Sequence, residues 1–222
     1  MKKLKYPCLV LDHDDTVVDS TATVHYPCFV EYMKDRFPKV HITLEEYFRY
    51  NYAPGVIPFF TEICGLTWAE MEDEEAYWKE YVRHHIPRAY PGIREILEEQ
   101  RARGGKIAVV SHSFSEHILR DYRANGLPEP DQIYGWEYPA EQRKPSPWPL
   151  RKIMETGGFA PEELLVVDDL KPGYDMAKAA GVPFAAAGWA NDIPQIEEDM
   201  RKNAPVYLKT VQEFRRFLFE DG

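Results

Sequence analysis

Short, continuous apolar runs alternate with amphipathic stretches along most of the chain. Four runs have the pattern of strands buried on both faces of a parallel sheet, at residues 8–11, 107–110, 164–167 and 183–187. Amphipathic patterns typical of helices lie between them and are followed directly by glycine or Asn-Gly, at residues 93–103, 115–124 and 149–156. Alternating β and α units predict an α/β fold, a three-layer sandwich with a mainly parallel sheet and right-handed crossovers.

Residues 21–88 break this alternation, because aromatic residues set among charges replace the strand-like runs. Residues 70–83 have an amphipathic pattern of helical period, and Tyr52-Ala53-Pro54-Gly55 indicates a loop. We therefore predict a small α-helical domain at residues 21–87, inserted into a discontinuous core of residues 1–20 and 88–222. Most of its aromatic side chains are expected to form the core of the insert, and a minority to line a substrate pocket.

Composition and charge restrict the classes of partner. The chain has 222 residues, of which 44% are hydrophobic, and a formal net charge of −10, so its average surface repels nucleic acid and anionic membranes. The apolar run near the N-terminus is too short for a signal peptide, and no stretch approaches a membrane span. The three cysteines lack metal-ligand spacing and indicate free thiols in a reducing compartment, so we expect a cytoplasmic protein. The oligomeric state is not predicted.

Polar residues follow the predicted strands where the strands end. Asp12 and Asp14 follow the first run, Ser111 the second, and Asp168 and Asp169 the third, while Lys144 lies in the loop before that third run. Ligands bind at the carboxyl ends of strands in open parallel sheets. Clustered carboxylates repel one another unless a cation neutralises them, and aspartate oxygens suit Mg²⁺. With a lysine and a hydroxyl facing the cation, this edge predicts a phosphoryl-binding site that can overcome the acidic surface.

In this order the motifs resemble those of the haloacid dehalogenase (HAD) superfamily. Residues 9–16 resemble its first motif, a hydrophobic strand running into Asp-x-Asp-x-Thr, and Ser111 resembles the second. Lys144-Pro145 is similar to the third motif, and Asp168-Asp169 followed by Gly173 to the fourth. The resemblance implies a Rossmann-like core with a helical cap domain, as in phosphatases of the phosphoglycolate phosphatase kind and in proteins of the beta-phosphoglucomutase type.

The resemblance also implies roles for these residues. Asp12 would be the nucleophile that forms an aspartyl-phosphate, and Asp14 the general acid and base. Mg²⁺ would be held by Asp12, Asp169 and the Asp14 carbonyl, with Asp168 binding directly or through water. Ser111 and Lys144 would hold the phosphoryl oxygens.

Several neighbouring residues have plainer interpretations. We expect Asp15 to be structural, Thr16 to order the loop by hydrogen bonding, and His13 to be a packed, hydrogen-bonded histidine. The pair His84-His85 is interpreted as ordinary surface, because neighbours on a helix do not face the same way.

The leading hypothesis is a Mg²⁺-dependent phosphatase that hydrolyses a small-molecule phosphate ester. Asp14 disfavours dehalogenation, because the dehalogenases of the family lack that second aspartate. A phosphosugar mutase stays open as the alternative, since its core motifs are the same. A non-enzymatic phosphorylated receiver is disfavoured by the order of the motifs and by the insert. Within the insert, the loop that carries Tyr52 and Gly55 is the candidate for contact with substrate, because glycine permits close backbone approach.

Overall fold

A parallel sheet forms the centre of the structure, a computed structural model that describes residues 4–220. The sheet has six strands in the order β5-β4-β1-β6-β7-β8, and every neighbouring pair is parallel. The strands are β1 (Cys8–Leu11), β4 (Lys106–Val110), β5 (Gln132–Tyr134), β6 (Leu164–Asp168), β7 (Phe184–Ala187) and β8 (Val206–Leu208). Strands β5 and β8 were not predicted, because these three-residue strands at the sheet edges are only partly buried and carry no continuous apolar run.

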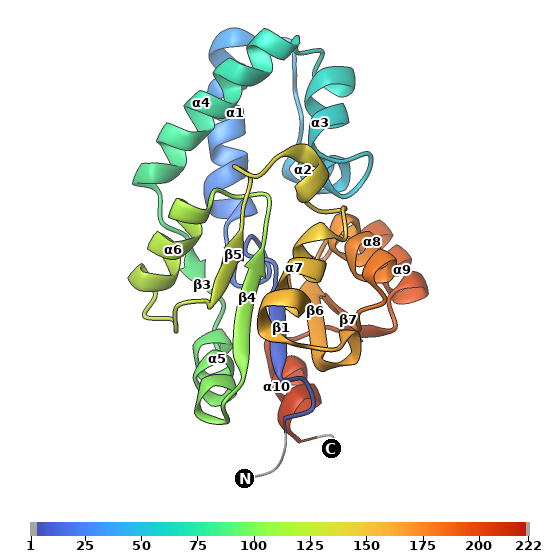
Figure 1. Cartoon of the computed structure of the whole chain (residues 1–222). Helices are drawn as coiled ribbons and strands as arrows, with labels where there is room; N and C mark the ends of the chain where they lie inside the picture. Colours follow the sequence, from blue (N-terminus) through green and yellow to red (C-terminus); the bar gives the residue numbers. More distant parts are fainter. Residues whose placement is uncertain (1–3, 221–222) are drawn as a thin grey trace.

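Helices cover both faces of this sheet (Figure 1). Successive residues of β1 point to opposite faces, so Leu9 and Leu11 join one apolar cluster and Cys8 and Val10 the other. The first face packs against α5 (Ile93–Ala102), α6 (Ser115–Ala124) and α10 (Val211–Phe219), and the second against α7 (Trp148–Gly157), α8 (Lys171–Ala180) and α9 (Pro194–Asn203). Two 3₁₀ turns, η3 (Ala140–Gln142) and η4 (Pro161–Glu163), complete the connections. The predicted three-layer α/β sandwich is confirmed.

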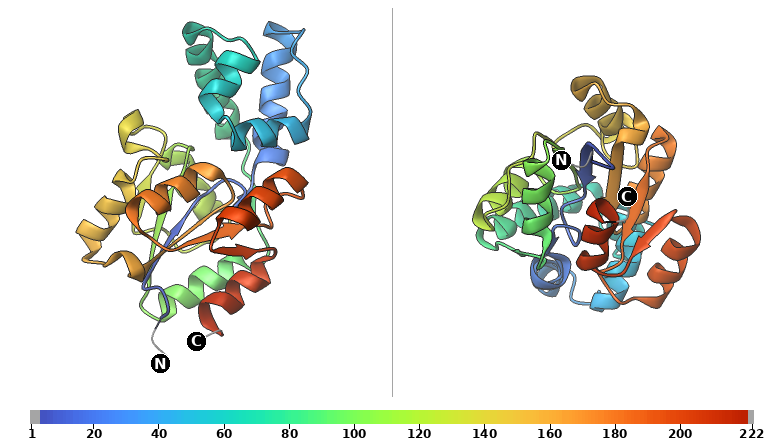
Figure 2. Two further views of the ribbon diagram at one scale, coloured as in Figure 1. Left: turned by 90° about the vertical axis from the view of Figure 1, so that its right-hand side faces the viewer. Right: turned by 90° about the horizontal axis from the view of Figure 1, so that it is seen from below.

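A helical segment separates β2 (Val18–Asp19) from β3 (Arg88–Ala89), two short antiparallel strands that pair with each other. We call residues 21–87 the cap. It lies beyond the carboxyl ends of the central strands (Figures 1 and 2). Its helices are η1 (Thr21–His25), α1 (Tyr26–Arg36), α2 (Leu44–Tyr52), α3 (Val56–Pro58), η2 (Phe59–Ile63) and α4 (Trp68–His84).

Local sequence signals start two helices of the cap, α2 and α4. Helix α2 begins at a capping box in which Thr43 and Glu46 satisfy each other's backbone amides. Helix α4 begins in the same way at Thr67 and Glu70. The helix predicted at residues 70–83 is therefore present. It starts slightly earlier, directly after its N-cap residue Thr67.

Aromatic side chains form the core of the cap, as predicted. Phe29, Tyr47 and Phe59 pack together, with ring centroids 5.1–5.5 Å apart. Trp68 is an exception, since it starts α4 and is 68% exposed. Tyr52 also departs from the cap core: it joins the apolar cluster on the second face of the sheet, and its hydroxyl donates a hydrogen bond to Asp199 on α9.

Among residues 4–220, no helix is both long and apolar enough to cross a membrane. Cys8, Cys28 and Cys64 are all buried free thiols, in agreement with the expectation from their spacing.

Candidate active site

The polar residues predicted at the strand ends come together at one edge of the sheet. Asp12 directly follows β1, Ser111 directly follows β4, and Asp168 is the last residue of β6. The Nζ atom of Lys144 lies 2.7 Å from Asp12 Oδ1 and 2.8 Å from Asp168 Oδ2. All of these side chains are buried, so the parallel topology gathers four separate segments of the sequence into one charged cluster.

The carboxylates of this cluster outnumber its cation. Oxygens of Asp12, Asp168 and Asp169 all lie within 4.8 Å of one another. Burial, opposed by Lys144 and reinforced by the neighbouring carboxylates, raises the pKa of Asp12 to about 7. Burial and three nearby aspartates also raise the pKa of Asp169 well above its usual range. A single ammonium group leaves this cluster short of positive charge.

Hydrogen bonding distinguishes the two acids at the end of β6. Asp168 accepts from the Leu170 amide at 2.8 Å through one oxygen and from Lys144 at 2.8 Å through the other. Asp169 Oδ1 is buried and has no hydrogen-bond partner among the described residues. An oxygen-only donor set with one unsatisfied buried carboxylate oxygen fits a hard divalent cation such as Mg²⁺.

Two further features hold this cluster in place. Burial alone would lower the pKa of Lys144, but Asp12 and Asp168 outweigh it and raise that pKa, so the side chain stays an ammonium. Gly173 in the first turn of α8 lies against Asp168, and a Cβ atom there would overlap the Asp168 carboxylate. Glycine is therefore required at this point of the fourth motif by close packing.

The loop after β1 turns at Asp15, which has a left-handed backbone with φ 57°. Its Oδ1 accepts hydrogen bonds from the amides of Ser20 and Thr21 at 3.2 and 3.0 Å, which agrees with a structural interpretation. His13 is buried and lies 3.0 Å from Asp121 through Nε2, as expected of a packed histidine. Thr16 differs from expectation, because its buried hydroxyl has no hydrogen-bond partner among residues 4–220.

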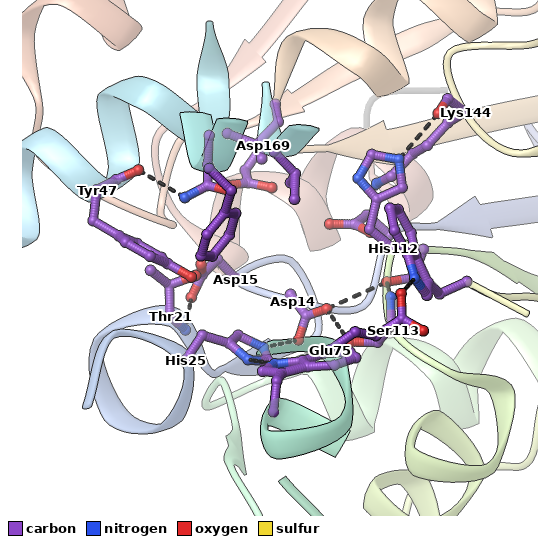
Figure 3. A pocket seen from close by; sticks show the side chains of 18 of the residues that line it. Asp14, Asp15, Thr21, His25, Tyr47, Glu75, His112, Ser113, Lys144 and Asp169 are labelled. Carbon is purple, nitrogen blue, oxygen red and sulfur yellow. Dashed lines mark hydrogen bonds and ion pairs between the residues drawn. The ribbon is translucent and has the colours of Figure 1, made fainter. Parts of the chain in front are cut away.

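Asp14 lies two residues after Asp12 and accepts hydrogen bonds from four side chains. Figure 3 shows it between His25 of the cap and Ser113 of the core. The donors are Ser20 at 2.7 Å, His25 at 2.8 Å, Ser111 at 3.3 Å and Ser113 at 2.6 Å. Burial alone would raise the pKa of Asp14, but His25 and the hydroxyl of Ser113 hold that pKa well below its usual range. Asp14 is therefore an ionised carboxylate in the free protein.

The histidine that binds Asp14 belongs to the cap. His25 ends η1, and its Nδ1 accepts a hydrogen bond of 3.0 Å from the indole N–H of Trp78 on α4. Asp14 raises the pKa of His25 against the opposing effect of burial. The indole N–H nevertheless requires Nδ1 to be unprotonated, so the ring proton lies on Nε2 and is donated to Asp14. Two helices of the cap thereby position a carboxylate of the core.

Sequence reasoning missed His25, Ser113 and Ser20. Ser113 carries a weak signal, because it lies two residues after Ser111 and two residues before the start of α6. His25 carries none, since eleven residues separate it from Asp14 in the sequence and only the fold of η1 brings them together.

A cavity of about 140 Å³ lies between the cap and this edge of the sheet. Its floor contains Asp12, Asp14, Ser111, Lys144 and Asp169, and its cap side contains Tyr47, Asn51, Phe60, Met71, Glu74 and Trp78. A second cavity adjoins it and shares Asn51, His112, Trp136 and Lys144. Tyr52 and Gly55, the residues predicted to contact substrate, line this second cavity and do not line the first.

His112 lies against the backbone of Lys144 and lines both cavities. Its Nε2 lies 3.0 Å from the Lys144 carbonyl oxygen (Figure 3). Burial and the nearby Lys144 ammonium lower the pKa of His112 to about 3. The ring is therefore neutral and donates to that carbonyl, which fixes the backbone of the segment that supplies Lys144.

Comparison with known proteins matches residues 9–187 to the model of the haloacid dehalogenase-like hydrolase family. A phosphoglycolate phosphatase from Aquifex aeolicus is 30% identical over 189 residues, which cover 82% of this chain and 84% of that protein. The pyrophosphatase PpaX from Halalkalibacterium halodurans is 30% identical over 116 residues, covering 51% of this chain and 54% of that one.

A solved structure supports the fold. A point mutant of CbbY from Rhodobacter sphaeroides, crystallised in complex with xylulose-(1,5)bisphosphate, has a TM-score of 0.70 to this chain at 19% identity. The match covers 93% of this chain and 95% of that one. Family model, sequence relatives and fold agree with the motifs read from the strand ends. The chain belongs to the haloacid dehalogenase-like hydrolase family and is an enzyme of its phosphatase kind.

Proposed function

We propose that this chain is a Mg²⁺-dependent phosphatase that hydrolyses a small-molecule phosphate monoester through an aspartyl-phosphate on Asp12. The observation that carries the proposal is the pairing of two aspartates with opposite surroundings. Asp12 lies in the cation-poor cluster with Lys144, and Asp14 lies two residues on, beneath the cap. This difference supports attack at phosphorus by Asp12 and proton transfer at the leaving oxygen by Asp14.

In the first step an oxygen of Asp12 bonds to phosphorus, and the bond from phosphorus to the ester oxygen breaks. Asp14 gives the leaving oxygen its proton. An anionic ester entering beside Asp14 raises the pKa of this carboxyl, because like charges disfavour its ionised form, so that it can hold the proton that it delivers. Lys144 and Ser111 bind the transferring phosphoryl oxygens.

In the second step a water molecule attacks the same phosphorus atom and the bond to Asp12 breaks. Asp14 accepts the proton of that water, a role that suits a carboxylate whose pKa is held low by His25 and Ser113. Free phosphate is released, the Asp12 carboxylate is restored and Asp14 regains the proton that it gave, so the cycle consumes only ester and water.

Asp12, Asp169 and the Asp14 carbonyl would hold the magnesium ion, and Asp168, which also anchors Lys144, would bind it directly or through water. Bound there, Mg²⁺ would neutralise the carboxylates and the phosphoryl group and hold them at reacting distance. The unsatisfied Asp169 oxygen supports this assignment.

The proposal is tested by phosphate release from a panel of phosphate monoesters with and without Mg²⁺. We expect turnover that EDTA abolishes reversibly, and loss of at least about 10³-fold in kcat for Asp12→Asn with an unchanged circular dichroism spectrum. Chromatography of the products separates hydrolysis from isomerisation. Full activity of Asp12→Asn would contradict the covalent step, and isomerised product without phosphate would replace the phosphatase by a mutase.

A further inference from the structure

The cap side of the site cavity is acidic and aromatic. It contains the rings of Tyr47, Phe60 and Trp78 and two consecutive glutamates, Glu74 and Glu75. Lys144 is the sole lysine or arginine among the lining residues that the structure describes, and Asp12 and Asp168 already hold it on the floor. The part of a substrate that extends from the phosphate toward the cap therefore meets carboxylates and aromatic side chains.

Glu74 is the unusual member of this wall. Its side chain is buried on α4 with 8% of the residue exposed, and it lines the cavity. No hydrogen bond or ion pair joins its carboxylate to any residue between 4 and 220, whereas Glu75 accepts a bond of 2.6 Å from the Trp136 indole. Buried carboxylates are almost always paired, so an unpaired one at a cavity surface is a candidate binding group for a ligand.

The electrostatic surroundings support the same conclusion. Burial and the neighbouring Glu75 raise the pKa of Glu74 to about 7, with His25 opposing them. A cation or hydrogen-bond donor placed against this carboxylate would remove the cost of ionising it. Trp78 and Tyr47 line the same cavity as Glu74, and aromatic rings near a carboxylate are a known environment for ammonium groups.

We propose that the substrate is a phosphate monoester of a small amino alcohol, whose ammonium group binds Glu74 among the aromatic rings of the cap. This inference rests on the proposed phosphatase function and specifies its leaving group. It separates this chain from relatives named for phosphoglycolate, because that ester carries a carboxylate next to its phosphate. A carboxylate turned toward the cap would face Glu74 with no basic residue of the first cavity, as far as its described lining extends, free to pair with it.

The second cavity offers the competing arrangement. Arg143 and Lys171 line it, with the Arg143 guanidinium 3.8 Å from the centre of the Trp136 ring and Lys171 paired with Asp175. A leaving group that turned into this cavity would meet positive charge, and a carboxylate there would be favoured. The two arrangements predict opposite orders of preference within one matched series of esters.

The test is a series of three phosphate esters with two-carbon leaving groups that end in an ammonium, a hydroxyl or a carboxylate: 2-aminoethyl phosphate, 2-hydroxyethyl phosphate and phosphoglycolate. With the wild-type enzyme and Mg²⁺, we expect kcat/KM to be highest for the ammonium ester and lowest for phosphoglycolate. The value for the ammonium ester should exceed that for the hydroxyl ester by about tenfold or more, as for a hydrogen bond to a charged group. 4-Nitrophenyl phosphate serves as the generic ester.

The variant Glu74→Gln keeps the shape of the side chain and removes its charge. It should lose the preference for the ammonium ester over the hydroxyl ester, mainly through KM, while Glu72→Gln on the exposed face of the same helix should retain that preference. A flat or reversed series in the wild-type enzyme, or an unchanged preference in a folded Glu74→Gln, would overturn the inference and leave the phosphatase proposal intact. Failure to hydrolyse even the generic ester would instead refute the phosphatase proposal itself.

Discussion

The carboxylates on the two sides of the cavity differ in what satisfies them. On the core side, Asp168 is bound by Lys144 and a backbone amide, and Asp14 accepts hydrogen bonds from four side chains. On the cap side, Glu74 is also buried and has no such partner among the described residues. The carboxylates of Asp14 and Asp168 are therefore held in fixed geometry, whereas that of Glu74 is available to a ligand that enters the cavity.

This difference teaches how one fold can keep its chemistry and vary its substrate. The floor is built from strand ends, whose positions the parallel hydrogen bonding fixes. The cap side is built from helices around an aromatic core. The residues with which these helices line the cavity can change without moving the strand ends. His25 and Trp78 connect the two sides, because they belong to the cap and yet position Asp14.

The largest effect that would test the comparison lies on the core side. Asp169→Asn removes the charge of the carboxylate that has an unsatisfied buried oxygen. We expect kcat/KM to fall by about 10²–10³-fold, as when one charge-stabilising group is lost, and the Mg²⁺ concentration for half-maximal activity to rise. Activity is measured against Mg²⁺ concentration, with Asp192→Asn at the exposed surface as the control. An unchanged Mg²⁺ dependence would mean that Asp169 does not hold the ion.

A second prediction concerns stability and the opposite side of the cavity. The pKa of Glu74 is about 7 in the folded chain, above its usual 4.5, so the folded state holds this proton more tightly than the unfolded state. The stability that this proton provides is complete below pH 4.5 and is lost as the pH rises through 7. Glu74→Gln should thus gain up to about 3 kcal/mol in free energy of unfolding, relative to wild type, between roughly pH 4.5 and pH 8.

Urea unfolding of both proteins at the two pH values measures that gain, with Glu72→Gln as the matched exposed control. His25, Asp73 and Glu75 also act on this carboxylate, and they are present in both proteins. A constant difference between wild type and Glu74→Gln across the pH range would show that Glu74 is paired in solution, and the contrast between the two sides would then disappear.

The smallest effect concerns the link between the two sides. His25→Ala removes the donor to Asp14, and we expect kcat to fall about tenfold, as when a group that orients a site residue is lost. Because His25 lowers the pKa of Asp14, the acid limb of the pH profile should also move to higher pH. His25→Gln, which restores a donor, should recover part of the rate. A loss of kcat with no shift of the acid limb would reduce His25 to a purely structural contact.

The sequence by itself determined the core strands, the fold class and the group at the strand ends. Continuous apolar runs predict buried parallel strands, and parallel strands bring the residues that follow them to one edge. The sequence alone therefore predicts one group at this edge: Asp12, Asp14, Ser111, Lys144, Asp168 and Asp169.

Only the tertiary structure decided which residues surround this group. The ends of parallel strands share one edge of a sheet, but no comparable rule brings residues of packed helices together. The approach of His25 to Asp14 and the burial of Glu74 therefore left no pattern in the sequence. The loop with Tyr52 and Gly55 shows the same limit. Its glycine and proline predicted a turn correctly, but the pairing of Tyr52 with Asp199, 147 residues away, turned that side chain toward α9. Contacts between distant segments depend on how whole elements pack, which local patterns do not encode.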